Sequence, residues 1–255
     1  MFAHLIEPGQ SGVGLAFTNR LGGVSQPPYD SFNLGRTDLD QVVDVASNFV
    51  TLRQRLGVSK IITTAQVHGN DVLEVSQDIV DRWGDGAELG DSIAGGRNLV
   101  KADAMVTTLA DVGLCIRVAD CLPVMLADPA SRVIGAAHAG RVGLLGGVLT
   151  QVVSAMRDLG ARQIEAWIGP HICGRCYEVP EPMAKAAWAQ LPDTKGQTSW
   201  GSPSIDLGRG AQALLSLAGV TAHMLGGCTY EDAALYSHRR EHGATGRQTG
   251  LIWLR

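Results

Sequence analysis

Three side chains that bind transition metals stand at the ends of apolar runs, each within two residues of a glycine or proline. They are His68, Cys121 and His138. Strand ends that border loops are where α/β proteins gather reactive groups, so these side chains could meet at one site. Two imidazoles and a thiolate suit zinc or copper, and three protein ligands leave a fourth position for water or substrate. Spacing alone does not establish a metal site, because a lone histidine or cysteine beside a strand is usually an ordinary core residue.

The same residue types permit a different chemistry. Cys121 could be the nucleophile of a cysteine hydrolase or deamidase, with His138 or His68 as its base. Asp120 directly precedes Cys121. At a turn, its carboxylate could orient a ligand histidine or act as an acid or base, and the alternative is an ordinary turn aspartate.

Arginines are the second group of candidate functional residues. A guanidinium stays charged and donates two parallel hydrogen bonds, which suits phosphate. Arg20 lies in a glycine-rich segment, while Arg239, Arg240 and Arg247 form a cluster near the end of the sequence. Surface arginines are usually only solvated, so we expect one of the three clustered arginines to bind an anion.

The remaining cysteines and histidines carry weaker signals. Cys173 and Cys176 have the spacing of a redox pair or of half a structural zinc site, but no second such pair is present and Cys228 is isolated. We interpret the pair as structural or incidental. Three further histidines are candidate acid or base groups because imidazole titrates near neutrality: His171, His242 and, first among them, His238.

A scaffold of alternating strands and helices is predicted to hold these residues. Helical spacing covers 41–56, 143–159, 181–191 and 207–218, with Gly57 ending the first helix and Asp206 as a candidate N-cap of the last. Strand-like runs are densest over 103–139, and 78–100 reads as a surface excursion. No repeat or linker is visible, so we predict one α/β domain over residues 1–255 with a mixed sheet.

Composition narrows the classes of partner and compartment. With 255 residues and 45% hydrophobic content, the chain can bury a large core. A net charge of -4 provides no basic field for nucleic acid. The opening residues lack a signal-peptide pattern, and no apolar run approaches the ~20 residues of a membrane span. An odd number of dispersed cysteines does not form a disulfide framework, which is typical of a reducing compartment. We therefore expect a cytoplasmic protein without membrane contact. The sequence is compatible with a homo-oligomer as well as with a monomer.

Eight motifs in one order extend the argument over nearly the whole chain. They are TNRLGGVSQPPYDSFNLG (18–35), QVHGNDV (66–72), ADAMVTT (102–108), ADCLPVML (119–126), AAHAG (136–140), IGPHICGRCYEV (168–179), CTYED (228–232) and YSHRREHGATGR (236–247). From about Phe17 to Leu254 the chain resembles the YfiH-like family, long labelled "laccase-domain" or "polyphenol oxidase". The resemblance implies a three-layer α/β/α fold and makes His68, Cys121 and His138 the metal ligands.

The resemblance also implies an activity. Members are regarded as purine nucleoside phosphorylases with adenosine deaminase activity, which implies adenosine, inosine and methylthioadenosine as substrates with phosphate. It favours ligand contact by Arg20, and purine specificity comes from the resemblance alone. A non-catalytic, metal-binding role in peptidoglycan quality control is the third interpretation. A literal multicopper laccase would need more histidines than the seven present.

Three positions depart from the family's usual pattern. Arg141-Val142-Gly143 replaces Trp-Arg-Gly, and His238 replaces the tyrosine of Ser-Tyr-Arg-Arg. Phe49 stands where an arginine commonly follows Asn48. None of these changes touches the three implied ligands, but each could alter how substrate is held.

Overall fold

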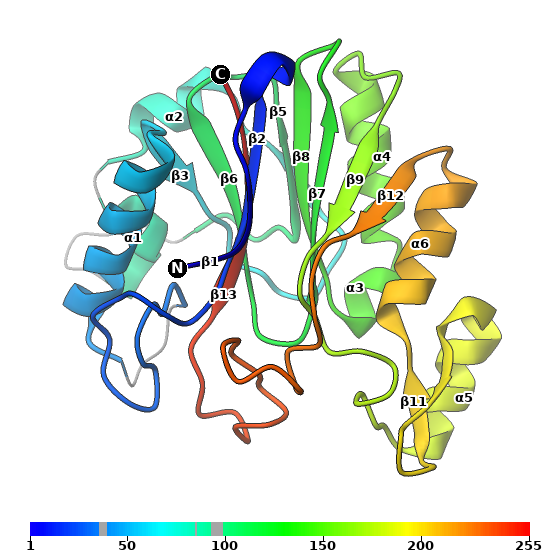
Figure 1. Cartoon of the computed structure of the whole chain (residues 1–255). Coiled ribbons are helices and arrows are strands. Elements are labelled where there is room, and N and C mark those ends of the chain that lie inside the picture. The colour runs from blue at the N-terminus through cyan, green and yellow to red at the C-terminus, as the bar shows by residue number, and fades with distance from the viewer. Residues whose placement is uncertain (36–39, 85, 93–98) are drawn as a thin grey trace.

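The computed structural model describes residues 1–35, 40–84, 86–92 and 99–255. Within these residues, two mixed β-sheets pack face to face (Figure 1). The five-stranded sheet has the order β1 (Phe2–Ile6), β2 (Val13–Thr18), β13 (Gln248–Leu254), β6 (Val112–Val118), β3 (Lys60–Ile62). The six-stranded sheet has the order β12 (Thr221–Met224), β9 (Glu165–Ile168), β7 (Leu122–Asp128), β8 (Val133–Ala139), β5 (Ala104–Thr107), β4 (Val72–Glu74).

Alternating side chains of the central strands fill two different layers of the core. In β7, Leu122, Val124 and Leu126 pack toward the helices on one side. The intervening Met125 and Ala127 pack toward the five-stranded sheet on the other. Side chains of a strand alternate between faces, so a strand covered on both faces is apolar at nearly every position. The strands β7, β8 and β13 are buried along their whole length for this reason.

Helices cover both outer faces of the paired sheets (Figure 1). The helix α1 (Val42–Leu56) packs Phe49 and Leu52 on the five-stranded sheet. The helices α4 (Val148–Asp158) and α6 (Leu207–Leu217) cover the six-stranded sheet. The predicted α/β class and mixed strand pairing are confirmed. The structure adds a second sheet to the predicted single sheet, so the layers run α/β/β/α.

The predicted helices agree with the structure except at one glycine pair. Helix α5 (Glu181–Gln190) is present, and α6 begins at Asp206, whose side chain accepts a hydrogen bond from the backbone N–H of Arg209 at 3.0 Å. The single helix predicted over 143–159 is divided into α3 (Arg141–Leu145) and α4, because Gly147 adopts a left-handed φ of 87°. A short β10 (Lys195–Gln197) pairs with β11 (Pro203–Ile205) beside α5.

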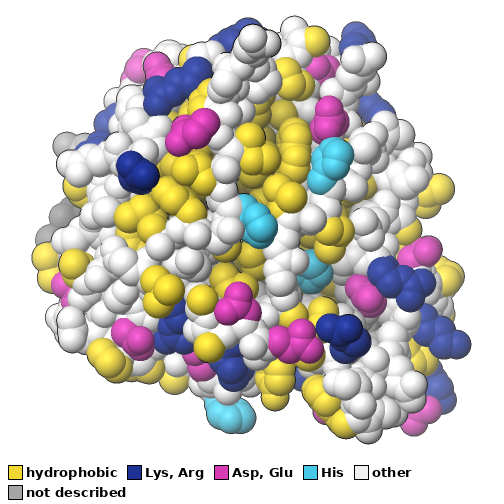
Figure 2. Space-filling view, viewed as in Figure 1, with side chains coloured by type: hydrophobic (Ala, Val, Ile, Leu, Met, Phe, Trp, Pro, Cys, Tyr) yellow, Lys and Arg dark blue, Asp and Glu magenta, His cyan; other side chains and the backbone are white. Residues whose placement is uncertain are grey.

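The segment predicted as a surface excursion contains more order than expected. It holds the short helix α2 (Gln77–Arg82) and the 3-10 turn Ala87–Ser92. Two other 3-10 turns, Gly9–Ser11 and Pro192–Thr194, connect elements elsewhere in the chain. Residues 85 and 93–98 of the excursion lie outside the described residues. On the face seen in Figure 2, hydrophobic side chains form a band where the two sheets meet, with charged side chains around it. Among the helices that the structure describes, none has the length and apolar character to cross a bilayer.

Candidate metal centre and its arginine-lined cavity

The structure brings His68, Cys121 and His138 together, as the sequence predicted. Their ligand atoms all lie within 4.8 Å of one another, and Sγ of Cys121 is 3.8 Å from Nε2 of His68. His138 belongs to β8, and His68 lies in the loop between β3 and β4. Cys121 occupies the turn by which the chain passes from β6 in one sheet to β7 in the other. The three donors therefore meet where the two sheets are joined.

One buried carboxylate, that of Asp103, positions both histidines. It accepts hydrogen bonds from the backbone N–H groups of Val67, His68 and Gly69 at 3.0, 2.9 and 2.7 Å. Its Oδ1 also lies 2.8 Å from Nδ1 of His138, which leaves Nε2 of that ring to face Cys121. A carboxylate behind a ligand histidine is the usual partner in metal sites. Asp103 belongs to the motif ADAMVTT but was not among the residues predicted from the sequence to form the site.

The electrostatics of the cluster favour a thiolate. Burial alone would raise the pKa of Cys121, but hydrogen bonds and charge from His138 and His68 lower it to about 6. Burial would lower the pKa of His138, but Asp103 and Cys121 raise it to about 9. Without a metal the pair is thus a thiolate beside an imidazolium at neutral pH. Metal binding would require loss of the imidazolium proton, because only neutral imidazole is a ligand.

Gly140, in the motif AAHAG, allows the close approach of the ligands. A Cβ atom at this position would lie 2.8 Å from Cδ2 of His68 and 2.9 Å from Sγ of Cys121. Both distances are shorter than carbon or sulfur contacts permit. The glycine is therefore required by space at the cluster.

Both carboxylate oxygens of Asp120 accept hydrogen bonds from neighbouring loops. Asp120 adopts a left-handed φ of 90°. Its Oδ1 accepts the hydroxyl of Thr229 at 2.6 Å, and its Oδ2 accepts the backbone N–H of Arg239 at 2.7 Å. The carboxylate that orients a ligand histidine belongs to Asp103, while Asp120 fastens two loops next to Cys121.

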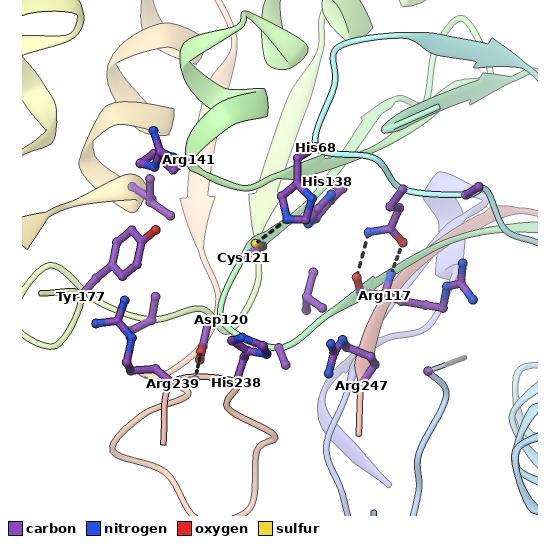
Figure 3. A pocket seen from close by; sticks show the side chains of 17 residues that line it. His68, Arg117, Asp120, Cys121, His138, Arg141, Tyr177, His238, Arg239 and Arg247 are labelled. Carbon is purple, nitrogen blue, oxygen red and sulfur yellow. Dashed lines mark hydrogen bonds between the residues drawn. The ribbon is translucent and has the colours of Figure 1, made fainter. Parts of the chain in front are cut away.

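A cavity of about 540 Å³ opens beside the cluster, with His68, Cys121 and His138 in its wall. Figure 3 shows Arg141, Tyr177 and Arg239 on one side of Cys121, and Arg117 and Arg247 on the other. Among the described residues that line the cavity, Asp120 carries the only carboxylate. The remaining lining is mostly apolar or neutral and includes Ile172, Leu207, Gln66 and His238. Such a lining suits a partly apolar ligand that carries negative charge.

The four arginines named from the sequence divide into two pairs. Arg239 and Arg247 line the cavity. Arg20 does not: its guanidinium pairs with Glu241 at 2.6 Å and Asp30 at 3.2 Å. Arg240 also lies outside the lining and donates to backbone carbonyls, including that of Thr229 at 2.5 Å. Their bonding indicates that Arg20 and Arg240 hold the loops together.

Two further arginines that line the cavity, Arg117 and Arg141, were not among the candidate anion ligands predicted from the sequence. Arg117 lies in β6, where an alternating pattern would have placed it on the face opposite Ile116. Arg141 opens α3 and was noted only as a departure from the family pattern. Of the three candidate histidines, His238 lines the cavity, whereas His171 and His242 do not. Burial lowers the pKa of His171.

Comparison with known proteins places the chain in a family. A profile described as "Multi-copper polyphenol oxidoreductase laccase" matches residues 14–255. The Escherichia coli protein "Purine nucleoside phosphorylase YfiH" is 35% identical over 97% of this chain and 96% of its own. The chain belongs to the YfiH-like family. A second relative is the Streptomyces griseus protein "Purine nucleoside phosphorylase ORF3". It is 41% identical over 98% of both chains.

A solved structure supports the same assignment. The crystal structure of YlmD from Geobacillus stearothermophilus matches this YfiH-like chain with a TM-score of 0.85 at 28% identity. The match covers 98% of this chain and 96% of that one. The whole described fold, including both sheets, is thus a YfiH-like fold.

Proposed function

We propose that this chain is a metal-dependent purine nucleoside phosphorylase. It would convert adenosine, inosine or methylthioadenosine, with phosphate, to the free base and the ribose 1-phosphate (methylthio-substituted for the last). The observation that carries the proposal is one cavity that joins a His2Cys cluster to four arginines. The phosphorylase names of relatives at 35% and 41% identity support it. The cavity volume falls within the range of small-molecule sites, ~300–1,000 Å³.

The donor set fits a resident metal ion. His68, Cys121 and His138 would hold it, and the lowered pKa of Cys121 supplies the thiolate that a ligand must be. Zn²⁺ is our proposed ion because it accepts mixed nitrogen and sulfur ligands, with Cu²⁺ as the alternative. The bound ion would supply Lewis-acid chemistry at the inner wall of the cavity.

The residues of the chain would perform the binding and proton transfers. Arg141 and Arg239 on one side, with Arg117 and Arg247 on the other, would hold and orient phosphate through charge-assisted hydrogen bonds. A phosphate oxygen then bonds to C1′ of the ribose as the bond from C1′ to the purine nitrogen breaks.

The leaving purine takes the bonding electrons and needs one proton. His238 is our proposed proton donor, because it lines the cavity outside the metal-type cluster and a histidine side chain can serve as a general acid. Asp120 would act through the loops it fastens, since both its oxygens already accept hydrogen bonds.

Adenosine deamination is our proposed second activity of the same cavity. In that reaction water replaces the amino group at C6 of adenosine, giving inosine and ammonia. Both reactions place a purine nucleoside in the cavity beside the cluster. The five free cysteines are in keeping with a reducing cytoplasm as the proposed compartment.

A second candidate, a cysteine hydrolase, is favoured by one observation. Asp103, His138 and Cys121 form a hydrogen-bonded series in which the thiol pKa is lowered to about 6. The same series supports an activated nucleophile. The two candidates differ in what Cys121 does during turnover.

Product analysis tests the proposed function. Metal-replete protein is incubated with adenosine, inosine or methylthioadenosine, with and without phosphate, and the products are separated by chromatography. We expect base and ribose phosphate only when phosphate is present, and slow formation of inosine from adenosine without it. No product from any purine nucleoside would refute the proposal.

Two variants separate the metal enzyme from the hydrolase. Cys121→His keeps a donor that zinc accepts, as three-histidine sites do, but cannot form a thioester. We expect residual zinc and residual phosphorolysis in Cys121→His, with both lost in His138→Ala. A covalent adduct on Cys121 trapped during turnover would favour the hydrolase instead.

A further inference from the structure

A second group of ligand atoms lies outside the cavity lining. Sγ of Cys173, Cys176 and Cys228 and a carboxylate oxygen of Glu231 all lie within 4.8 Å of one another. The backbone N–H of Cys173 donates to Sγ of Cys228 at 3.3 Å, and the thiol of Cys176 donates to Glu231 at 3.5 Å. We propose that these four residues form a second metal site, which takes one Zn²⁺ ion and has a structural role.

The donor set is that of a closed zinc site. Three thiolates and one carboxylate supply four ligands, the number found in structural sites, where no position stays open for substrate. Zinc–sulfur bonds of about 2.3 Å place the sulfurs of a tetrahedron about 3.8 Å apart. The ligand atoms lie within 4.8 Å of one another, so small rotations of the side chains would bring the sulfur atoms to the distance that zinc requires. The thiolate-rich set favours zinc over Mg²⁺ or Ca²⁺, which prefer oxygen ligands.

The charge around the cluster suits this occupant. Three thiolates and a carboxylate carry four negative charges, of which one Zn²⁺ offsets two. The guanidinium of Arg175 lies 3.5 Å from Glu231 and adds a further positive charge at the exposed side. The arginine pairs with one carboxylate oxygen, Oε2, while Oε1 faces Cys176. The carboxylate can thus contact the metal and the arginine together.

The topology explains why distant cysteines meet here. Strands β9 and β12 are parallel neighbours, so the loops that follow them leave the same edge of the six-stranded sheet. The loop after β9 carries Cys173 and Cys176, and the loop after β12 carries Cys228 and Glu231. Backbone hydrogen bonds from Thr229 to His171 and from His171 to Gly227 already join the two loops.

A metal at this site would brace the wall of the cavity. Ile172 and Tyr177, on either side of the two cysteines, line the cavity. Thr229, next to Cys228, donates to Asp120 beside the first cluster. None of the four proposed ligands is among the lining residues. The second site therefore acts on the shape of the cavity and supplies no reacting group.

Cobalt spectroscopy isolates the second site from the first. Co²⁺ bound to thiolate gives a charge-transfer absorption in the near ultraviolet. In Cys121→Ser the first cluster has no thiolate, so any such absorption must come from the other cysteines. We expect Cys121→Ser to bind Co²⁺ with strong charge-transfer absorption, which added Zn²⁺ displaces. The absorption should disappear when Cys173→Ser and Cys228→Ser are added to Cys121→Ser.

Two controls keep the result interpretable. Cys115→Ala removes a buried cysteine of the five-stranded sheet and should leave the absorption of Cys121→Ser unchanged. Glu231→Gln keeps all the thiolates, so it should retain the absorption but bind Zn²⁺ more weakly. An absence of charge-transfer absorption in folded, reduced Cys121→Ser would overturn the proposal.

Alkylation of the unmodified protein provides a test that needs no variant. Zn²⁺ should protect the partly exposed Cys173 and Cys228 from iodoacetamide, as mapped by mass spectrometry, and a chelator should restore their labelling. Equal labelling with and without Zn²⁺ would overturn the proposal. So would a disulfide among the three cysteines of the cluster in protein that was alkylated on lysis, since it would assign the cluster to redox chemistry.

Discussion

The carboxylate of Asp103 lies 2.8 Å from Nδ1 of His138, and the same group holds the backbone that carries His68. One buried side chain thus sets the direction of two donors that are far apart in the sequence. Burial opposes its ionisation, but the hydrogen bonds from His138 and from the backbone of Gly69 and Val67 keep the pKa of Asp103 below its ordinary value. Asp103 is therefore charged at neutral pH and positions the site before any metal arrives.

Asp103→Asn should weaken metal binding without removing a ligand. The amide loses the negative charge that stabilises His138 and cannot accept all the bonds from residues 67–69. Loss of such an outer partner typically costs 10- to 100-fold in metal affinity, and we expect roughly that decrease. Competition with a chelator measures it. Asp71→Asn is the matched control, because the exposed Asp71 contacts the site only through its backbone carbonyl; an equal loss in both variants would contradict the assigned role.

Gly140→Ala should abolish the His2Cys site through space alone. The added methyl would come within 2.9 Å of both His68 and Cys121, so the ligands must separate. Elemental analysis should show loss of the ion from this cluster, while circular dichroism stays unchanged. Gly84→Ala is the control, since its Cβ would have no neighbour within 4 Å. Full metal retention by Gly140→Ala would show that the ligands tolerate a wider spacing.

Alkylation of Cys121 should have a low pH midpoint in metal-free protein. Only the thiolate reacts, and the pKa of Cys121 is lowered to about 6, so its labelling should be near maximal at pH 7 and fall as the pH drops through about 6. An ordinary thiol would lose reactivity below about pH 8.5. Burial raises the pKa of Cys115 to about 12, so Cys115 should stay unlabelled as the internal reference. Zn²⁺ should suppress labelling of Cys121; a midpoint near pH 8.5 would contradict the thiolate assignment.

Substitution by glutamine should raise KM for phosphate at Arg141 but lower the stability of the fold at Arg20. Arg141 lines the cavity, so Arg141→Gln should raise KM for phosphate roughly 10- to 100-fold, the value of one charge-assisted hydrogen bond. Arg20 is paired with Glu241 and Asp30, so Arg20→Gln should lower the free energy of unfolding by about 1–3 kcal/mol and change KM little. Steady-state kinetics and urea denaturation measure the two effects.

A surface substitution completes the comparison of the arginines. Arg82→Gln removes an exposed side chain whose one ion pair among the described residues is with Asp78 in α2, so it should change neither KM nor stability measurably. If Arg20→Gln raised KM for phosphate as much as Arg141→Gln, the assignment of Arg20 to loop structure would be wrong.

The sequence predicted the metal-type cluster but not the group that orders it. Each of the three residues stands within two positions of a glycine or proline near a predicted strand end, which is a local signal. Asp103 lies 35 residues from His138, and nothing local links the two. The same limit applies to the second sheet. Strands buried on both faces are mostly apolar, so the apolar runs within β7 and β13 look alike in sequence although the two strands belong to different sheets.

The positions of the cavity arginines could likewise be predicted only in part from the sequence. Arg239, Arg240 and Arg247 are close in sequence, but only Arg239 and Arg247 line the cavity, while Arg240 donates to carbonyls of its own loop. Arg117 comes from a strand of the five-stranded sheet and could not be assigned to the cavity until the crossing at Cys121 was known. Cys228 was isolated in sequence for the same reason, since only the parallel pairing of β9 and β12 brings it to Cys173.

The place of β13 between β2 and β6 has a consequence for biosynthesis. Thr18 and Thr249, which meet across this pairing, are separated by 231 residues. While a ribosome is still translating the middle of the chain, β2 and β6 each present an unpaired edge, which is an opportunity for misassociation. Arg247 immediately precedes the closing strand. The part of the cavity wall that Arg247 forms is therefore completed only after β13 has been synthesised and has paired with β2 and β6.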